Sequence, residues 1–321
     1  MKAIRVLQPG PSSVMQLTEV PDLKPEPGQV LIRVKAAGVN PVDTYLRAGE
    51  QGYKPICPYT PGIDLAGEVV EISDGVIHVK PGDRVYSAGC LTGSYAEYAL
   101  AKASQVFHLP DNLSFSQGAT IHVPYATAYR ALMLKANARP GETVLVHGGT
   151  GGVGIAAIQI CRWKGMTAIA TAGSAHGANI LKSIGTSAVV DHHDPEHFQT
   201  IISLTEGRGV DIILEMMASL NLGKDLQLLR TAGRVVVVGS RGPVEINPRD
   251  IMSRDAMITG LALRNATDSE LFAIHLDLID GFKRGFLNPI ISHEFPLSEA
   301  PHAHDLIMNT RAEGKIVLIP E

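Results

Sequence analysis

The sequence predicts an α/β protein in which a β-rich domain is combined with a doubly wound parallel sheet. Three observations lead to this fold class. The first third of the chain consists of short apolar runs separated by turns. Residues 143–146 form a β-branched run that stops at a glycine cluster. After the cluster, apolar runs alternate with segments of helical spacing, as in a parallel sheet with helical crossovers.

Length and composition set limits on the class of protein. The chain has 321 residues, 45% of them hydrophobic and 19% charged, which is ordinary for a soluble globular protein. This length allows two domains with separate cores. The formal net charge of −4 gives no reason to expect a nucleic-acid partner. No apolar run is long enough to cross a bilayer.

The cysteines and the N-terminus indicate the compartment. Cys57, Cys90 and Cys161 are widely spaced and odd in number, which argues against a disulfide framework and for a reducing environment. Residues 1–5 begin like a strand and not like a signal peptide. We therefore predict a cytoplasmic protein.

The first 124 residues are predicted to form a small barrel or sandwich of short strands. Residues 29–37 alternate between the two faces of a strand. Proline-glycine turns at 61–62 and 81–82 separate further runs. The other strands are expected at 3–7, 65–72, 84–87, 93–100 and 104–109.

At Ser114, which forms a capping-box pattern with Gln117, the sequence pattern changes. Short strands give way to an alternation of strands and helices. A helix is expected at 124–135. The six strands of the parallel sheet are expected at 143–146, 167–171, 188–190, 210–215, 234–239 and 257–263. The end of the chain is predicted to return to the first domain, with a helix at 269–284, a strand near 289–294, a helix after the N-cap Ser298 and a strand at 315–319. The predicted domains are 1–124 with 266–321, and 125–265.

The glycine cluster contains Gly149, Gly151 and Gly154, which together spell G-x-G-x-x-G. The first allows a tight strand-to-helix turn, the second lets the backbone approach a pyrophosphate, and the third lets helix and strand pack closely. N–H groups at the new helix terminus would face the phosphates. A glycine-rich turn with only a packing role is the alternative, but the strand before and the helix after favour dinucleotide binding.

The residues after the second strand of this sheet favour NADPH over NADH. An NAD-binding fold places an acidic residue there to hold the ribose 2′-hydroxyl, yet residues 148–190 contain no Asp or Glu. Gly173 and Ser174 leave room for a 2′-phosphate instead. Ser174 and His176 are the local donors, and no Arg or Lys lies directly beside them.

We expect neither a zinc site nor a site for any other metal ion. Zinc needs about three Cys, His or carboxylate ligands. Where zinc alcohol dehydrogenases carry an early Cys and a Gly-His-Glu, this chain has Asn40 and the sequence Gly-Ile-Asp at 62–64. His192 and His193 are adjacent, so on a strand they would point to opposite faces. His304 is expected at a solvated helix end, and the Asp of 62–64 in a turn.

Several segments together carry a family resemblance that runs almost end to end. They are AAGVNPVDTY at 36–45, YTPGIDLAGEV at 59–69, GSYAEYAL at 93–100, PYATAYRAL at 124–132, VLVHGGTGGVG at 144–154, GVDIILEM at 209–216, NLGKDL at 221–226 and GRVVVVGSRGPVEINPRD at 233–250. The chain resembles the zinc-free quinone oxidoreductases of the medium-chain dehydrogenase/reductase superfamily, and within them the zeta-crystallin type of NADPH:quinone reductase.

The resemblance implies a GroES-like barrel, a Rossmann domain, a cleft between them and assembly as homodimers or homotetramers. It places Tyr45 at the nicotinamide end and Gly173, with Ser174 beside it, at the 2′-phosphate end. The pyrophosphate loop would comprise Thr150, Gly151, Gly152 and Val153. The other implied cofactor contacts are His192, Asn221, Val238, Gly239, Ser240, Arg241, Leu261, Ala262 and Leu263. Two departures from the family pattern are Gly149-Thr150 in place of Ala-Ser and Asn179 in place of a basic residue.

The implied reaction is hydride transfer from NADPH to a quinone or another conjugated carbonyl. Such a reaction needs hydrogen-bond donors aimed at the carbonyl oxygen, and the candidates are the Tyr45 hydroxyl and the Asn40 amide. Alternatively, Asn40 could cap its own loop, and Tyr45 could pack against the nicotinamide without donating a hydrogen bond. One-electron and two-electron transfer both stay open. The alternative functions are alkenal or enone reduction, an NADPH-binding crystallin-like structural role, and a nucleic-acid-binding role that would need a basic stripe.

Overall fold

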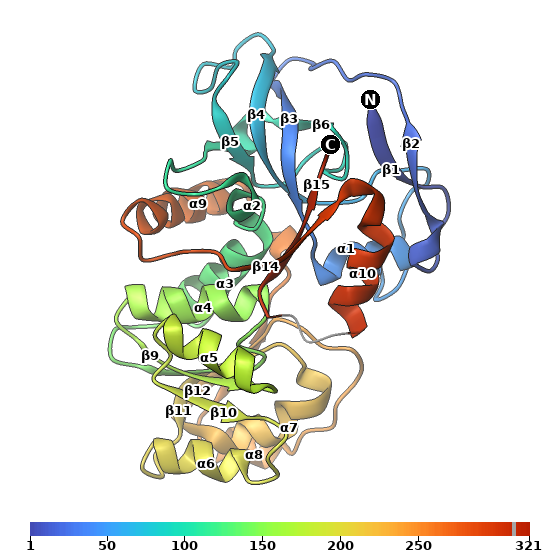
Figure 1. Cartoon of the computed structure of the whole chain (residues 1–321). Helices are drawn as coiled ribbons and strands as arrows, with labels where there is room; N and C mark the ends of the chain where they lie inside the picture. Colours follow the sequence, from blue (N-terminus) through green and yellow to red (C-terminus); the bar gives the residue numbers. More distant parts are fainter. Residues whose placement is uncertain (310–312) are drawn as a thin grey trace. The chain divides into compact units, whose positions relative to one another are not determined.

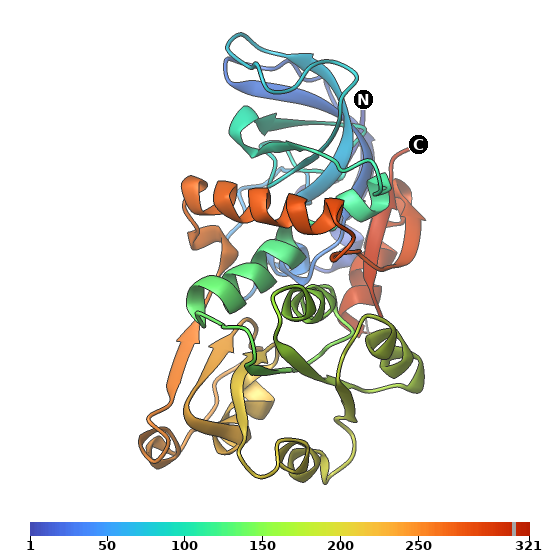
Figure 2. The same cartoon turned by 90° about the vertical axis from the view of Figure 1, so that its left-hand side faces the viewer.

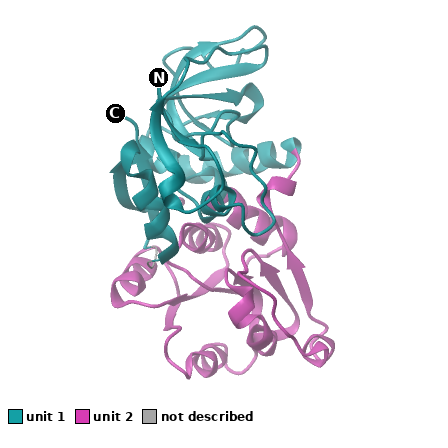
Figure 3. Cartoon of the chain, turned by 90° about the vertical axis from the view of Figure 1, so that its right-hand side faces the viewer, with its two compact units in different colours: residues 1–123, 268–283, 288–321 teal, residues 124–267, 284–287 magenta. Residues whose placement is uncertain are grey.

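The computed structural model describes residues 1–309 and 313–321, which divide into two compact units. The first unit comprises residues 1–123, 268–283 and 288–321, and the second comprises 124–267 and 284–287. Figure 3 colours the two units separately. Among the described residues, no helix has both the length and the apolar character needed to cross a membrane.

The first unit is built on strands from both ends of the sequence. Their bounds are β1 Lys2–Val6, β2 Met15–Glu19, β3 Gln29–Gly38, β4 Asp64–Ile72, β5 Arg84–Ser87, β6 Tyr98–Lys102, β7 Val106–His108, β14 Ile291–Pro296 and β15 Lys315–Ile319. Within the described residues, β1 and β2 pair with each other, and a seven-stranded sheet runs β14-β15-β3-β4-β5-β7 with β6 also paired to β3. Because Val317 pairs with Gly38 and Leu318 with Ala37, the end of the chain returns to the first unit as predicted.

Short helices connect and cover these strands. Their bounds are η1 Ser12–Val14, α1 Pro41–Ala48, η2 Ala103–Gln105, α2 Phe115–Gly118, α9 Asp268–Lys283, η6 Leu297–Glu299 and α10 Ala300–Asn309. The predicted capping box is confirmed, because the N–H of Gln117 donates to Ser114 Oγ at 3.2 Å and Gln117 accepts the N–H of Ser114 in return. The prediction that Ser298 caps the last helix is wrong, because Ser298 lies inside η6 and α10 begins at Ala300.

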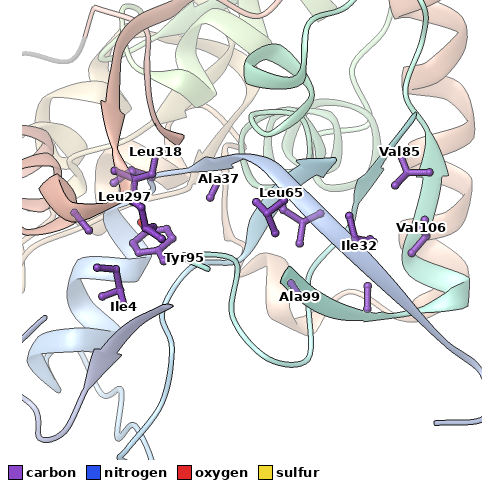
Figure 4. Packing of buried hydrophobic residues seen from close by; sticks show 14 of the residues in the cluster. Ile4, Ile32, Ala37, Leu65, Val85, Tyr95, Ala99, Val106, Leu297 and Leu318 are labelled. Atoms are coloured by element: carbon purple, nitrogen blue, oxygen red, sulfur yellow. The ribbon is translucent and has the colours of Figure 1, made fainter. Parts of the chain in front are cut away.

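The core of the first unit follows the alternation seen in the sequence. Val30, Ile32 and Val34 of β3 are buried and pack with residues of β4, β5 and β15. Figure 4 shows Ile32 in this core together with Leu65, Val85 and Leu318. The strand predicted at 93–100 begins only at Tyr98. Gly93 itself cannot belong to an extended strand, because its φ is +85° and a Cβ there would lie 2.0 Å from the carbonyl oxygen of Thr60.

The second unit contains the predicted parallel sheet. Its strands are β8 Thr143–Val146, β9 Thr167–Ala172, β10 Ala188–Asp191, β11 Val210–Glu215, β12 Leu229–Val237 and β13 Met257–Gly260. They are ordered β10-β9-β8-β11-β12-β13, and every neighbouring pair is parallel. The chain starts in the middle at β8, builds outward to β10 and then reverses to β11. This is the doubly wound arrangement, and its switch point lies between β8 and β11.

Helices cover both faces of this sheet. Their bounds are η3 His122–Ala126, α3 Thr127–Tyr129, η4 Arg130–Lys135, α4 Gly152–Trp163, α5 Ala175–Ser183, α6 His197–Leu204, α7 Ala218–Leu228, α8 Pro248–Met252 and η5 Leu263–Asn265. Figure 1 shows α4 and α5 on one side of the strands and α6 and α7 on the other, and Figure 2 shows several of these helices end-on. The helix predicted at 124–135 is largely π-helical, and β13 ends before the predicted residue 263.

Leu145, at the centre of β8, provides a test of this packing. It is fully buried in the core of the second unit, so Leu145→Ala should lower the free energy of unfolding by about 2–5 kcal/mol through lost contacts and a cavity. Leu220, in α7 of the same unit, is 75% exposed, and Leu220→Ala should change it by less than about 0.5 kcal/mol. Chemical denaturation measures both values. Equal losses for the two variants would contradict this assignment of the core.

Candidate dinucleotide and substrate site

The predicted dinucleotide-binding residues lie where the parallel strands of the second unit end. The glycine loop follows β8, Gly173 follows β9 and His192 follows β10. Asn221 lies in α7 after β11, while Val238 to Arg241 follow β12 and Leu261 to Leu263 follow β13. The carboxyl ends of parallel strands share one edge, which is where open α/β sheets bind ligands. The structure therefore brings these predicted residues to a common edge.

The glycine loop leaves space at one position and none at two others. A Cβ on Gly154 would lie 2.5 Å from the carbonyl oxygen of Gly148, and a Cβ on Gly149 would lie 2.9 Å from the Cβ of Ala170. A Cβ on Gly151 would meet only the carbonyl oxygen of Gly148, at 3.5 Å. Gly151 is the N-cap of α4, so the free N–H groups of the first turn start here. An open backbone next to these donors fits a pyrophosphate.

Two imidazoles converge on the end of β9. A Cβ on Gly173 would lie 2.6 Å from His192 Nε2 and 2.9 Å from His193 Nε2, and the two ring centroids are 4.4 Å apart. The prediction that these side chains point to opposite faces of a strand is wrong, because β10 ends at Asp191 and both histidines lie in the following turn. Ser174 caps α5, since its Oγ accepts the N–H of Gly177 at 2.9 Å.

The segments after β12 and β13 are held mainly through their backbones. The N–H groups of Val238 and Gly239 both donate to the carbonyl oxygen of Glu215, at 2.8 and 3.1 Å. Arg130 Nη1 donates to the carbonyl oxygen of Ala262 at 3.2 Å. The Ser240 Oγ in the first of these segments donates to the carbonyl oxygen of Gly242 at 2.8 Å.

In the first unit, Asn40 belongs to a buried polar network. Asn40 is the N-cap of α1 and is 1% exposed. Its Nδ2 donates to Asp64 Oδ2 at 3.1 Å, and its Oδ1 accepts from Lys315 Nζ at 2.6 Å. The backbone N–H of Asn40 donates to Asp43 at 2.9 Å. Tyr45 follows one turn later in α1 and is partly exposed. Sequence reasoning missed Asp43 and Lys315, and it wrongly placed Asp64 in a turn, since Asp64 is the buried first residue of β4.

Burial shifts the pKa values of the ionisable groups in this network. It raises the pKa of Asp43 to about 7 and that of Asp64 to about 6, and it lowers the pKa of Lys315. The donor set at the position of the zinc ligands is thus an amide and a carboxyl group with an ammonium beside them. These residues do not fit a zinc ion, which binds thiolates, imidazoles and carboxylates and is repelled by a cation.

His304 was also misjudged from the sequence. It is 1% exposed, and its Nε2 lies 3.1 Å from the hydroxyl of Tyr95. Burial lowers its pKa to about 3. His304 is therefore a neutral core residue of the first unit, and not a solvated residue at a helix end.

A second polar cluster, not recognised from the sequence, lies beneath the glycine loop. His147 lies between the end of β8 and the glycine loop, Glu215 is the last residue of β11, and Asp225 lies in α7. His147 Nε2 is 2.8 Å from Asp225 Oδ1 and 3.7 Å from Glu215 Oε2. The available signal was the acidic residue Glu215, which directly follows the apolar residues 212–214 of β11.

Comparisons with known proteins identify the family. Residues 26–111 match the model of the alcohol dehydrogenase GroES-like domain, and residues 152–280 match that of the zinc-binding dehydrogenase. The quinone oxidoreductase of Sus scrofa is 46% identical over 321 residues, which cover 99% of this chain and 98% of that protein. The chain belongs to the quinone oxidoreductase family.

Solved structures of quinone oxidoreductases and their relatives share the fold of the whole chain. The Escherichia coli quinone oxidoreductase complexed with NADPH has a TM-score of 0.91 at 27% identity, with 100% of each chain covered. A mycobacterial protein complexed with NADPH has a TM-score of 0.91 at 29% identity, again with 100% of each chain covered. These similarities confirm the predicted fold class, a GroES-like domain with a Rossmann-type parallel sheet in the medium-chain dehydrogenase/reductase superfamily.

Two glycines of the loop should respond differently to alanine. Gly151→Ala should change the free energy of unfolding by less than about 1 kcal/mol, because a Cβ fits there and φ is −74°. It should nevertheless weaken NADPH binding, since the methyl group would occupy the space of the pyrophosphate. Gly154→Ala should lower both stability and binding, because its Cβ would collide with the backbone. Denaturation and NADPH titration separate these outcomes. Unchanged NADPH affinity in Gly151→Ala would exclude this loop as the phosphate site.

Proposed function

We propose that this chain uses NADPH to reduce quinones or related conjugated carbonyls, without zinc. The observation that carries the proposal is the similarity to quinone oxidoreductases over the full length. The open backbone at Gly151 and the absence of an acidic side chain at Gly173 support NADPH. The ammonium of Lys315 beside Asn40 supports chemistry that uses hydrogen bonds in place of a metal.

Each part of the chain has a distinct role in the proposed reaction. The loop Thr150-Gly151-Gly152-Val153 binds the pyrophosphate, and Gly173 and Ser174 with His192 lie at the 2′-phosphate. NADPH, when bound, supplies the hydride or electrons from its nicotinamide. The remaining contacts line the cofactor and its nicotinamide, and they are Asn221, Val238, Gly239, Ser240, Arg241, Leu261, Ala262 and Leu263.

Two side chains, one in α1 and one at its N-cap, are proposed to act on the substrate. The Tyr45 hydroxyl donates a hydrogen bond to the carbonyl oxygen, where negative charge develops. Asn40 is fixed by Lys315 and Asp64, and its amide keeps one Nδ2 hydrogen for a second donation. The fixed Asn40 also anchors the start of the helix that carries Tyr45.

Location and assembly complete the proposal. The free thiols of Cys57, Cys90 and Cys161 support a reducing compartment, and we place the protein in the cytoplasm. A homodimer or homotetramer stays a prediction based on the family resemblance.

A substrate panel tests the proposal. Quinones, enones and alkenals are offered separately with NADPH or NADH, and the consumption of reduced nicotinamide is followed by absorbance. Quinones with NADPH should be turned over fastest, because residues 148–190 carry no Asp or Glu to repel the 2′-phosphate. Faster alkenal turnover would make the chain an alkenal reductase. Tight NADPH binding without reduction of any acceptor would favour a crystallin-like structural role, and tighter binding of NADH would refute the cofactor assignment.

The role of Tyr45 is tested by removing its hydroxyl. Tyr45→Phe should lower quinone turnover by roughly a hundredfold, which corresponds to the loss of one donor to a developing oxyanion. NADPH should still bind with its original affinity. Tyr98→Phe, which removes a hydroxyl from β6 of the same unit, should leave turnover unchanged. If Tyr45→Phe also turned over quinones normally, Tyr45 would be reduced to a packing role.

A further inference from the structure

The cluster beneath the glycine loop joins ionisable groups from three separate elements. His147 precedes the loop, Glu215 ends β11 and Asp225 lies in α7. Glu215 and Asp225 are fully buried and His147 is 4% exposed. Burying charged groups is costly unless they are paired and hydrogen-bonded. This triad of His147, Asp225 and Glu215 therefore has to balance its own charges.

The geometry indicates how the balance is reached. The 2.8 Å contact between His147 Nε2 and Asp225 Oδ1 is a direct hydrogen bond. Among the described residues, Glu215 Oε2 and Asp225 Oδ2 have no hydrogen-bond partner, and one potential ligand atom from each of the three residues lies within 4.8 Å of the others. Two buried carboxyl groups facing each other retain a proton between them. A metal ion would need the space between His147 and Asp225 that the hydrogen bond already occupies.

Glu215 connects the triad to several segments of the dinucleotide edge. Its backbone oxygen accepts the N–H groups of Val238 and Gly239. Its Oε1 accepts the N–H of Met217 and, at 3.4 Å, a hydrogen bond from Asn221 Nδ2. His147 is covalently joined to Gly148, which opens the glycine loop. Three proposed cofactor segments thus depend on one buried cluster at the switch point between β8 and β11.

We propose that the His147–Asp225–Glu215 triad positions the glycine loop, Asn221 and the segment after β12, and so determines the affinity of this enzyme for NADPH. This inference rests on the proposed cofactor site. The three residues are positioning residues, because they act through the segments that touch the cofactor. Loss of the triad should affect cofactor binding more strongly than turnover at saturation.

The retained proton gives the triad a pH dependence. Burial raises the pKa of Glu215 to about 8, with Asp225 adding to the rise and His147 opposing it. Among the described residues, the charged groups that face Glu215 are Asp225 from α7 and His147 from the end of β8, while Met217 and Asn221 contribute uncharged donors. As pH rises through this value, a negative charge develops beneath the pyrophosphate loop and should repel the anionic cofactor.

The first experiment compares two substitutions of Asp225. Asp225→Ala removes the partner of His147 and should raise the Kd for NADPH about tenfold, the effect of losing one charged hydrogen bond. The kcat at saturating NADPH and quinone should stay within about threefold of the original value. Asp225→Asn keeps an acceptor for His147 and offers a donor to Glu215, so it should restore most of the affinity.

Thr205→Val is the matched control. Thr205 is buried, and its Oγ1 binds the backbone of α6 and the N–H of Gly209, just before the opposite end of β11. Its loss should lower stability without changing the Kd for NADPH. If Asp225→Ala changes the Kd no more than Thr205→Val does, the triad is only structural and the inference is wrong.

The second experiment needs no destabilising variant. The Kd for NADPH of the unsubstituted protein should rise as pH increases through about 8, whereas the 2′-phosphate titrates near pH 6. In Asp225→Asn the step should move to lower pH, because burial still raises the pKa of Glu215 but the negative charge of Asp225 no longer adds to the rise. A step that stays near pH 8 in Asp225→Asn, or a Kd that changes when a metal chelator is added, would overturn the inference. Absence of NADPH binding in the unsubstituted protein would instead refute the proposed function itself.

Discussion

The close approach of α4 to the end of β8 is the constraint on which the dinucleotide edge depends. A side chain at Gly154 would collide with the backbone of Gly148 and Gly149. Because this position is glycine, the helix can begin directly behind the strand, and its first N–H groups face the open position at Gly151. The order of strands then brings the ends of β9, β11 and β12 to the same edge. Helix packing and ligand binding thus both require that position 154 is a glycine.

Much of this architecture could be predicted because it follows from backbone periodicity and glycine sterics. The apolar runs of β8 and β11 are buried on both faces, so their composition alone marks them as strands of a parallel sheet. The capping box at Ser114 and the glycine loop are local patterns, and each is decided by neighbours in the sequence. Errors arose where an element began or ended several residues from its predicted boundary, as for β6, which begins at Tyr98, and β13, which ends at Gly260. His192 and His193 lie beyond the end of β10, and the period of two no longer applies to them.

The polar interior could not be predicted in the same way. Lys315 and Asn40 are 275 residues apart, and in the sequence Lys315 resembles any lysine at the start of a strand. Asp225 and His147 are 78 residues apart, and Asp225 has the spacing of an ordinary helical surface residue. A hydrophobic pattern shows which positions are buried, but it does not show which polar residues become buried as pairs. Such pairs are determined by tertiary structure, and here they lie beneath the residues proposed to bind cofactor and substrate.

The pairing of β15 with β3 has a consequence for biosynthesis. The residues of the second unit are nearly contiguous, so a ribosome can release a segment able to fold while the chain is still growing. The first unit has to wait, because Ala37 and Gly38 at the end of β3 lack their partner strand until β15 has been translated. During that interval the exposed edge and the unmatched carboxyl groups of Asp43 and Asp64 are open to chaperones and to aggregation. The order of translation thus leaves the half of the enzyme that carries Tyr45 as the last to mature.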